Sequence, residues 1–184
     1  MFRMPSLILI LSIFAMPAFA GNSTKSSDND HEAKIILQFH TMFGVNDPFL
    51  SHETPLPNDP TLRGILGDYQ SWKIKKSVNG MLLSDGDLFV NIKGLIFGNG
   101  TDNDEENFRA LVSCQLTPDV PGGASATFAT FKTGPFSVSH PIGKGNANIN
   151  AHIPNFPNSC IAPVVMILNG DETEGDVWFA VTGN

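Results

Sequence analysis

Five histidines are the residues of this sequence that most readily bind metals or transfer protons. They are His31, His40, His52, His140 and His152. A zinc site usually takes three or four ligands at short spacings, and no two of these histidines stand in an HxH, HxxxH or HExxH arrangement. His40 and His52 flank a proline-rich loop, so only the fold could bring them together. We therefore predict that they do not share a metal site.

Two acidic loops contain the oxygen ligands that calcium prefers. They have the sequences GNGTDNDEEN (98–107) and NGDETEGD (169–176). The potential ligands are Asn99, Asp102, Asp104, Glu105 and Glu106 in the first loop and Asn169, Asp171, Glu172, Glu174 and Asp176 in the second. Neither loop has the glycine and glutamate positions of an EF-hand. Solvated hairpin tips are the favoured interpretation, and calcium binding stays open as the alternative.

The sequence contains no motif that identifies a catalytic centre. It lacks the GxSxG motif of serine hydrolases, and the residues QLTPDVP after Cys114 lack the histidine and methionine of a blue-copper site. Two carboxylates of a glycosidase could come from distant parts of the chain, so a small hydrolase stays open. We assign no catalytic, cofactor-binding or metal-binding residue, and enzyme activity is not the favoured interpretation.

The most unusual polar pattern lies in the segment NANINAHIP (146–154). Every second residue is polar, and this row consists of Asn146, Asn148, Asn150 and His152. The opposite row consists of Ala147, Ile149, Ala151 and Ile153. A row of amides can hydrogen-bond sugars or ordered water, but it can equally be the solvated side of an antiparallel strand, which is the favoured interpretation. The polar row is kept as a weak candidate for a binding face.

We predict that β-strands carry these residues, because the apolar residues recur with a period of two. Such segments are IILQFHTMF, SWKIKKSV, DLFVNIKGLIF, NFRALVSC, SATFATFKT, FSVS, NANINAHIP, IAPVVMIL and DVWFAVTG. The pair Asp85-Gly86 predicts a hairpin turn, and Pro163 predicts a bulge in a central strand. Residues 35–184 are therefore predicted to form one all-β domain, an antiparallel sandwich or barrel of about eight strands.

Two further predictions concern the buried face of the first strand and the loop that follows it. In the first strand the row of Ile35, Leu37, Phe39, Thr41 and Phe43 is the more apolar one, so we expect it to face the core. The loop from Val45 to Pro60 holds four apolar side chains and four prolines. We expect it to be an ordered cover over an edge or end of the sandwich, with Phe49 buried.

The N-terminal segment and the overall charge concern where the protein works. Residues 1–20 have a basic start, a short apolar core and an AFA sequence before Gly21, which predicts a signal peptide cleaved between Ala20 and Gly21. Residues 21–34 are predicted to be a flexible polar leader, and no later segment is apolar enough to span a membrane. The formal net charge of −7 argues against nucleic acid as a partner. We expect a secreted or periplasmic protein.

The two cysteines, Cys114 and Cys160, fit an exported chain that meets an oxidising compartment. We predict that they form a disulfide, which would contribute roughly 4 kcal/mol on the chain-entropy model. Two free thiols are the alternative, but the sequence has no CxxC motif that would favour reactive cysteines.

The strings TMFGVNDPF, FRALVSC, CIAPVVMIL and WFAVTG, together with the block from Arg63 to Phe97, resemble a family of small exported bacterial proteins whose activity is uncharacterised. The resemblance covers most of the chain after the signal segment and implies export, a single domain and the cysteine pair. It implies no substrate, cofactor or catalytic residue. We therefore expect a non-catalytic binding or surface-interaction module, with a glycan or a protein surface as partner. A small secreted hydrolase and a structural envelope component are the alternatives.

Overall fold

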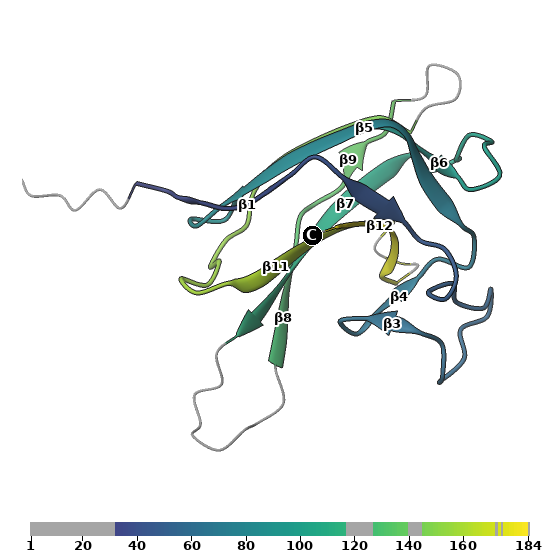
Figure 1. Ribbon diagram of the computed structural model, residues 1–184, viewed down its shortest axis with the longest axis horizontal. Helices are drawn as coiled ribbons and strands as arrows, with labels where there is room; N and C mark the ends of the chain where they lie inside the picture. Colours follow the sequence, from purple (N-terminus) through teal and green to yellow (C-terminus); the bar gives the residue numbers. More distant parts are fainter. Residues whose placement is uncertain (1–31, 117–126, 140–144, 172, 174, 184) are drawn as a thin grey trace, which may run out of the picture. The chain divides into compact units, whose positions relative to one another are not determined.

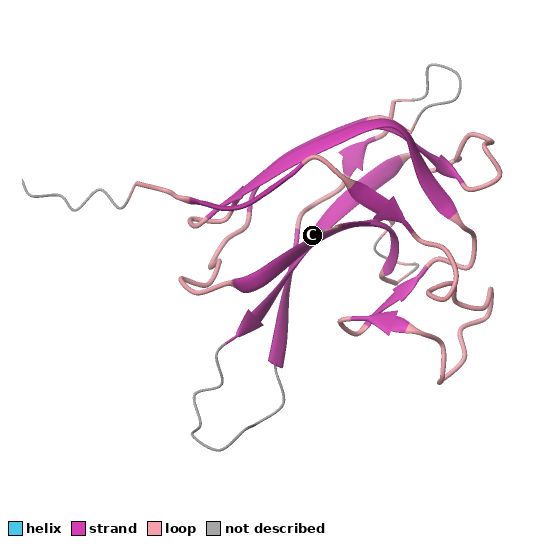
Figure 2. Cartoon of the chain, in the orientation of Figure 1, coloured by secondary structure: helices cyan, strands magenta, loops and turns pink. Residues whose placement is uncertain are grey.

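The computed structural model describes residues 32–116, 127–139, 145–171, 173 and 175–183. The predicted signal peptide, its cleavage site at Ala20 and Gly21, and the leader up to residue 31 lie outside these residues. The described chain forms strands, turns and loops and no helix (Figure 2). Within that part of the chain, nothing helical is long and apolar enough to cross a membrane.

Twelve strands build the described domain. They are β1 (Ile35–Phe39), β2 (Met42–Gly44), β3 (Thr61–Leu62), β4 (Ile65–Gly67), β5 (Trp72–Leu83), β6 (Asp87–Phe97), β7 (Asn107–Leu116), β8 (Thr127–Lys132), β9 (Phe136–Ser137), β10 (Ala147–His152), β11 (Ile161–Asn169) and β12 (Val177–Thr182). β2, β3, β4 and β9 have only two or three residues each. The remaining strands agree with the predicted number of about eight.

The strands form two sheets that pack as a sandwich rather than closing into a barrel (Figure 1). Sheet A has the order β1-β5-β6-β10, and sheet B has the order β3-β4-β12-β11-β7-β8, with β2 added to β12 and β9 to β7. The all-β sandwich is therefore confirmed. One strand pair differs from the antiparallel prediction, because the short β4 runs parallel to β12. It occupies the part of the β12 edge that β2 leaves free.

The core lies between the sheets and follows the predicted alternation. Leu88, Val90 and Ile92 of β6 are at most 2 % exposed, and β5 and β6 are joined through the Asp85-Gly86 turn, where Gly86 takes a positive φ of 95°. β11 is central, between β12 and β7. Its pairing with β7 shifts register between Ile161 and Val164, on either side of the proline that predicted a bulge. Period-two patterning was therefore sufficient to assign these strands and their buried faces.

The expected apolar row of the first strand is correct at Phe39 and wrong at Phe43 and at Ile35, which is 55 % exposed. Phe39 is 4 % exposed, whereas Phe43 is 64 % exposed and Met42 is buried instead. The chain leaves sheet A after β1 and enters sheet B at β2, which pairs with β12. Because the two sheets face the core from opposite sides, this crossing changes which residues of the segment point inward.

The loop from Val45 to Pro60 is organised around a buried carboxylate. Asp59 Oδ2 accepts hydrogen bonds from the backbone amides of His52 (3.1 Å) and Leu56 (2.9 Å), and Asp59 Oδ1 lies 2.5 Å from His52 Nδ1. The loop packs against β4 and β12, where the Phe49 and Trp178 ring centroids are 6.1 Å apart. Phe49 is nevertheless 38 % exposed, so the expectation that it is fully buried is wrong.

The disulfide between Cys114 and Cys160 is present, with Cα atoms 4.9 Å apart. Cys114 lies in β7, and Cys160 directly precedes β11, the neighbour of β7 in sheet B. The cross-link therefore fastens two adjacent strands whose cysteines are 46 residues apart along the chain.

Candidate binding face

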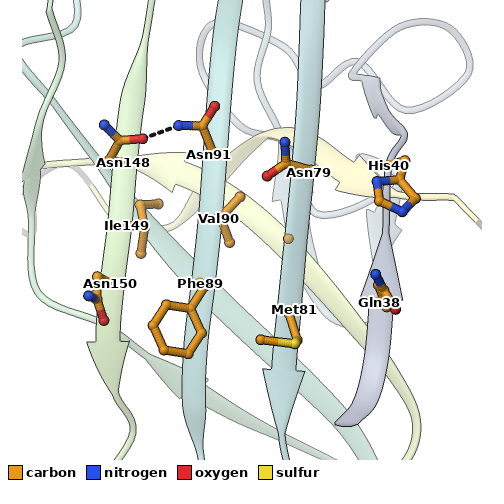
Figure 3. Close-up of a pocket in the computed structure, with 11 residues that line it drawn as sticks. Gln38, His40, Asn79, Met81, Phe89, Val90, Asn91, Asn148, Ile149 and Asn150 are labelled. Carbon is orange, nitrogen blue, oxygen red and sulfur yellow. Dashed lines mark hydrogen bonds between the residues drawn. The ribbon is translucent and has the colours of Figure 1, made fainter.

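The outer face of sheet A carries a row of amides that crosses three neighbouring strands. Asn79 of β5 pairs with Asn91 of β6, and Asn91 pairs with Asn148 of β10. His40, which directly follows β1, lies beside Asn79 at the end of this row (Figure 3). Side chains two residues apart on a strand share a face, so the register of four strands creates the row from residues far apart in sequence.

A second row runs parallel to the first, two residues further along each strand. It consists of Gln38 of β1, Met81 of β5, Phe89 of β6 and Asn150 of β10, which the strand register aligns. Phe89 is 37 % exposed, and its ring stands on the open face of the sheet (Figure 3). This row therefore combines an accessible aromatic ring and a thioether with an amide at each end.

A shallow groove of about 450 Å³ lies between the two rows. Its floor contains the intervening residues Gly80, Val90 and Ile149, whose strand positions face inward. A side chain at Gly80 would lie only 2.2 Å from the Phe39 ring, so the glycine lets this ring pack directly beneath the groove. The groove is thus supported by the core and by a regular hydrogen-bonded sheet, which holds its polar groups in place.

Most polar groups along this groove have hydrogen-bonding capacity to spare. Asn91 Nδ2 donates to Asn148 Oδ1. Within the described part of the chain, the side chains of Gln38, Asn79 and Asn150 make no hydrogen bond. Each amide can donate and accept at the same time. Such groups match hydroxyls, which also donate and accept, better than they match a ligand with a single type of polar group.

Only two of the four candidate residues of the polar row line the groove. These are Asn148 and Asn150. Asn146 has a structural task, because its Oδ1 accepts a hydrogen bond of 2.9 Å from the backbone of Gly94. Gly94 takes a positive φ of 83° opposite an irregularity in β5. His152 lies beyond the second row, where its Nδ1 is 2.7 Å from Asp87 Oδ1.

Sequence reasoning missed the groove residues outside β10: Gln38, His40, Asn79, Met81, Phe89 and Asn91. The alternation in DLFVNIKG separates Phe89 and Asn91 from Leu88, Val90 and Ile92, so the pattern puts the two residues on one face of their strand. What the sequence did not contain was the order of the strands, because the pairing of β10 with β6 joins segments more than fifty residues apart.

A second polar hollow, of about 560 Å³, lies where both acidic loops approach one end of the sandwich. We call this region the acidic end; its polar lining includes His52, Glu53, Asp68, Asp104, Glu105 and Asn169. Asp68 is 7 % exposed, and burial raises the pKa of its carboxyl. Both of its oxygens are engaged: Oδ1 accepts from Tyr69 N (2.7 Å) and Oδ2 from Trp72 Nε1 (2.5 Å).

The acidic loops also use their side chains to hold their own turns. Asn99 Oδ1 accepts from the backbone and hydroxyl of Thr101, and Asn103 Oδ1 accepts from Glu105 N. The Thr173 hydroxyl and amide bind Asp171 Oδ1 and lower the pKa of that carboxyl. In the part of the chain that the structure describes, no three histidine, cysteine or acidic side chains are placed to hold a metal ion.

His40 and His52 line different hollows. His40 lines the groove on sheet A, whereas His52 pairs with Asp59 and lines the acidic end. His31 and His140 lie outside the described residues.

No family model matches the chain, and no curated protein or solved structure is significantly similar to it.

Proposed function

We propose that this protein is an exported, non-catalytic binding module that recognises a glycan through the groove on sheet A. The observation that carries the proposal is the pair of rows across four strands, which places amide groups without a hydrogen bond among the described residues beside an exposed aromatic ring. Export is supported by the signal-like residues 1–20 and by the disulfide, which persists in oxidising compartments.

In the proposed binding mode the two rows make different contacts with the sugar. Phe89 offers a flat apolar surface against which the C–H face of a sugar ring can pack. Asn79, Asn91 and Asn148 offer donors and acceptors to neighbouring hydroxyls. Because these side chains stand on paired strands, little backbone order has to be gained when a ligand binds.

The groove also has dimensions that suit a chain molecule rather than a single small sugar. Four adjacent strands at about 4.8 Å spacing span roughly 14 Å. The groove is open to solvent along this width, with side chains of all four strands at its margins (Figure 3). An oligosaccharide can therefore contact several amides at once.

The test is calorimetric titration of the domain with oligosaccharides selected on a glycan array. Phe89→Ala and Asn91→Ala should each weaken binding about tenfold, a change of about 1.4 kcal/mol in binding free energy. Phe43→Ala and Asn58→Ala are matched controls, since both residues are exposed and lie outside the groove. Equal losses in the controls, or no loss in the groove variants, would contradict the proposal.

The acidic end supports a second candidate, a small secreted hydrolase. The specific observation is Asp68, a carboxyl whose pKa is raised by burial and which lines a hollow together with Glu53, Asp104 and Glu105. The hydrogen bonds that occupy both oxygens of Asp68 favour a structural task instead. Turnover that is lost in Asp68→Asn while the fold is retained would support the hydrolase; a structural envelope component would show neither ligand nor turnover.

A further inference from the structure

Two lysines stand beside the groove on sheet A, beyond its amide row. A neighbouring hollow of about 430 Å³ is lined by Lys76, Lys93, Ser139 and Asn146, and it shares Asn91 and Asn148 with the groove. The two hollows therefore adjoin at the amide row. A ligand that contacts Asn91 from the groove comes within reach of the lysines on the other side.

The lysines are available to a ligand. Lys93 and Lys76 are exposed, and neither forms an ion pair or a hydrogen bond within the described part of the chain. Other lysines are engaged: Lys73 Nζ donates to Gly98 O (2.8 Å), and Lys132 pairs with Asp176. Asp87, the acid on the far side of the groove, is paired with His152.

We propose that the ligand is an acidic glycan, with its sugar rings over Phe89 and Asn91 and its anionic group between Lys76 and Lys93. This inference rests on the proposed function and specifies the ligand class of the same groove. Phe89, Asn91 and Lys93 alternate on the outward side of β6, so they follow one another at about 6.7 Å along the strand. A sugar of a glycan that lies across the strands in the groove can therefore contact Asn91 while its anionic group extends along β6 toward the cations.

The charge distribution limits the class of anion. The whole chain has a formal net charge of −7, which repels a densely charged polymer such as nucleic acid. Two lysines on an otherwise amide-rich and aromatic surface suit a polymer with isolated charges. A glycan with a carboxylate or a phosphate ester on some of its sugar residues has this pattern.

The test compares two oligosaccharides of the same linkage and length, one of uronic acids and one neutral, by calorimetry at low and at physiological salt. The wild-type protein should prefer the acidic ligand by about tenfold at low salt, and salt should reduce this preference. Lys76→Gln combined with Lys93→Gln should abolish the preference. Lys73→Gln combined with Lys75→Gln is the charge-matched control, because neither lysine lines either hollow.

A third ligand distinguishes a carboxylate from a phosphate ester as the anionic group. It is the otherwise neutral oligosaccharide with one phosphate ester added. Preference for either acidic ligand that disappears in the double lysine variant supports the inference. If acidic and neutral ligands bind alike, or if the lysine variant retains the preference, the inference is wrong. In that case a loss of binding in Phe89→Ala still supports the proposed function, whereas unchanged binding in Phe89→Ala overturns both.

Discussion

The groove on sheet A and the acidic end both contain polar side chains, but they use them differently. At the acidic end the side chains of Asp68, Asp171 and Asn103 accept hydrogen bonds from nearby amides, hydroxyls or the indole of Trp72. Along the groove, Asn79 and Asn150 make no such bond within the described residues. Several polar side chains at the acidic end and in its loops therefore hold the backbone in place, whereas these groove amides are left accessible.

This difference has a physical origin in the two kinds of backbone. A loop leaves amides and carbonyls without ladder partners, and short polar side chains satisfy them. In a sheet the ladder already pairs the backbone groups, so outward side chains are left to water or to a ligand. We therefore expect substitutions at the acidic end to lower the stability of the domain, and substitutions in the groove to weaken ligand binding.

Among the polar residues of the two regions, the largest expected effect on stability is at Asp68. Asp68→Ala removes the acceptor for the buried indole of Trp72 and for Tyr69 N, so the free energy of unfolding should fall by about 2–3 kcal/mol. Asn79→Ala in the groove should change it by less than about 0.5 kcal/mol. Chemical denaturation measures both values, and equal effects of the two substitutions would break the distinction between the regions.

A smaller loss of stability is expected at Phe49, in the loop beside the acidic end. Its ring packs near Trp178 but is 38 % exposed, so Phe49→Ala should lower the free energy of unfolding by about 1–2 kcal/mol. A fully buried phenylalanine such as Phe108 should lose about 3–5 kcal/mol on the same substitution. If Phe49→Ala costs as much as Phe108→Ala under the same denaturant titration, the loop is a larger part of the core than its exposure indicates.

The smallest expected effect is the acid sensitivity of the same loop. The pKa of Asp59 is held below its ordinary value of 3.8, mainly by the hydrogen bond from Leu56 N, with a further bond from His52 N. Because the folded pKa is the lower one, this carboxylate stabilises the loop above pH 3.8, and the contribution is lost as the pH falls through the folded pKa.

Thermal melts between pH 6 and pH 2 measure this contribution of Asp59. The melting temperature of the wild-type protein should fall by a few degrees more than that of Asp59→Asn, which cannot be protonated at this position. Parallel curves for the two proteins would show that the carboxylate of Asp59 does not organise the loop.

The sequence predicted those parts of the fold that depend on local pattern. Alternation identified the inward residues of β6 and β10, the Asp85-Gly86 pair identified a hairpin, and Pro163 indicated the bulge in β11. It did not predict the crossing between sheets near His40, because the apolar residues on either side of the crossing fit one uninterrupted strand equally well.

The candidate site was predictable only in part, for the same reason. The amides of β10 were visible as a row within one segment. Their partners Asn79, Asn91 and Gln38 became recognisable only when the strand order β1-β5-β6-β10 aligned them. Strand order depends on long-range packing, which a single sequence does not display.

The most direct test of the central claim is to map the bound ligand by nuclear magnetic resonance. The domain, labelled with nitrogen-15, is titrated with the oligosaccharide that binds most tightly in calorimetry, and shifts of backbone and side-chain amide signals are followed. We predict that the side-chain amide signals of Asn79, Asn91, Asn148 and Asn150 move together with the backbone signals of β6. The backbone amide signals of Asp68, Asp104 and Glu105 should stay in place. Shifts concentrated at the acidic end, with the groove unaffected, would contradict this prediction.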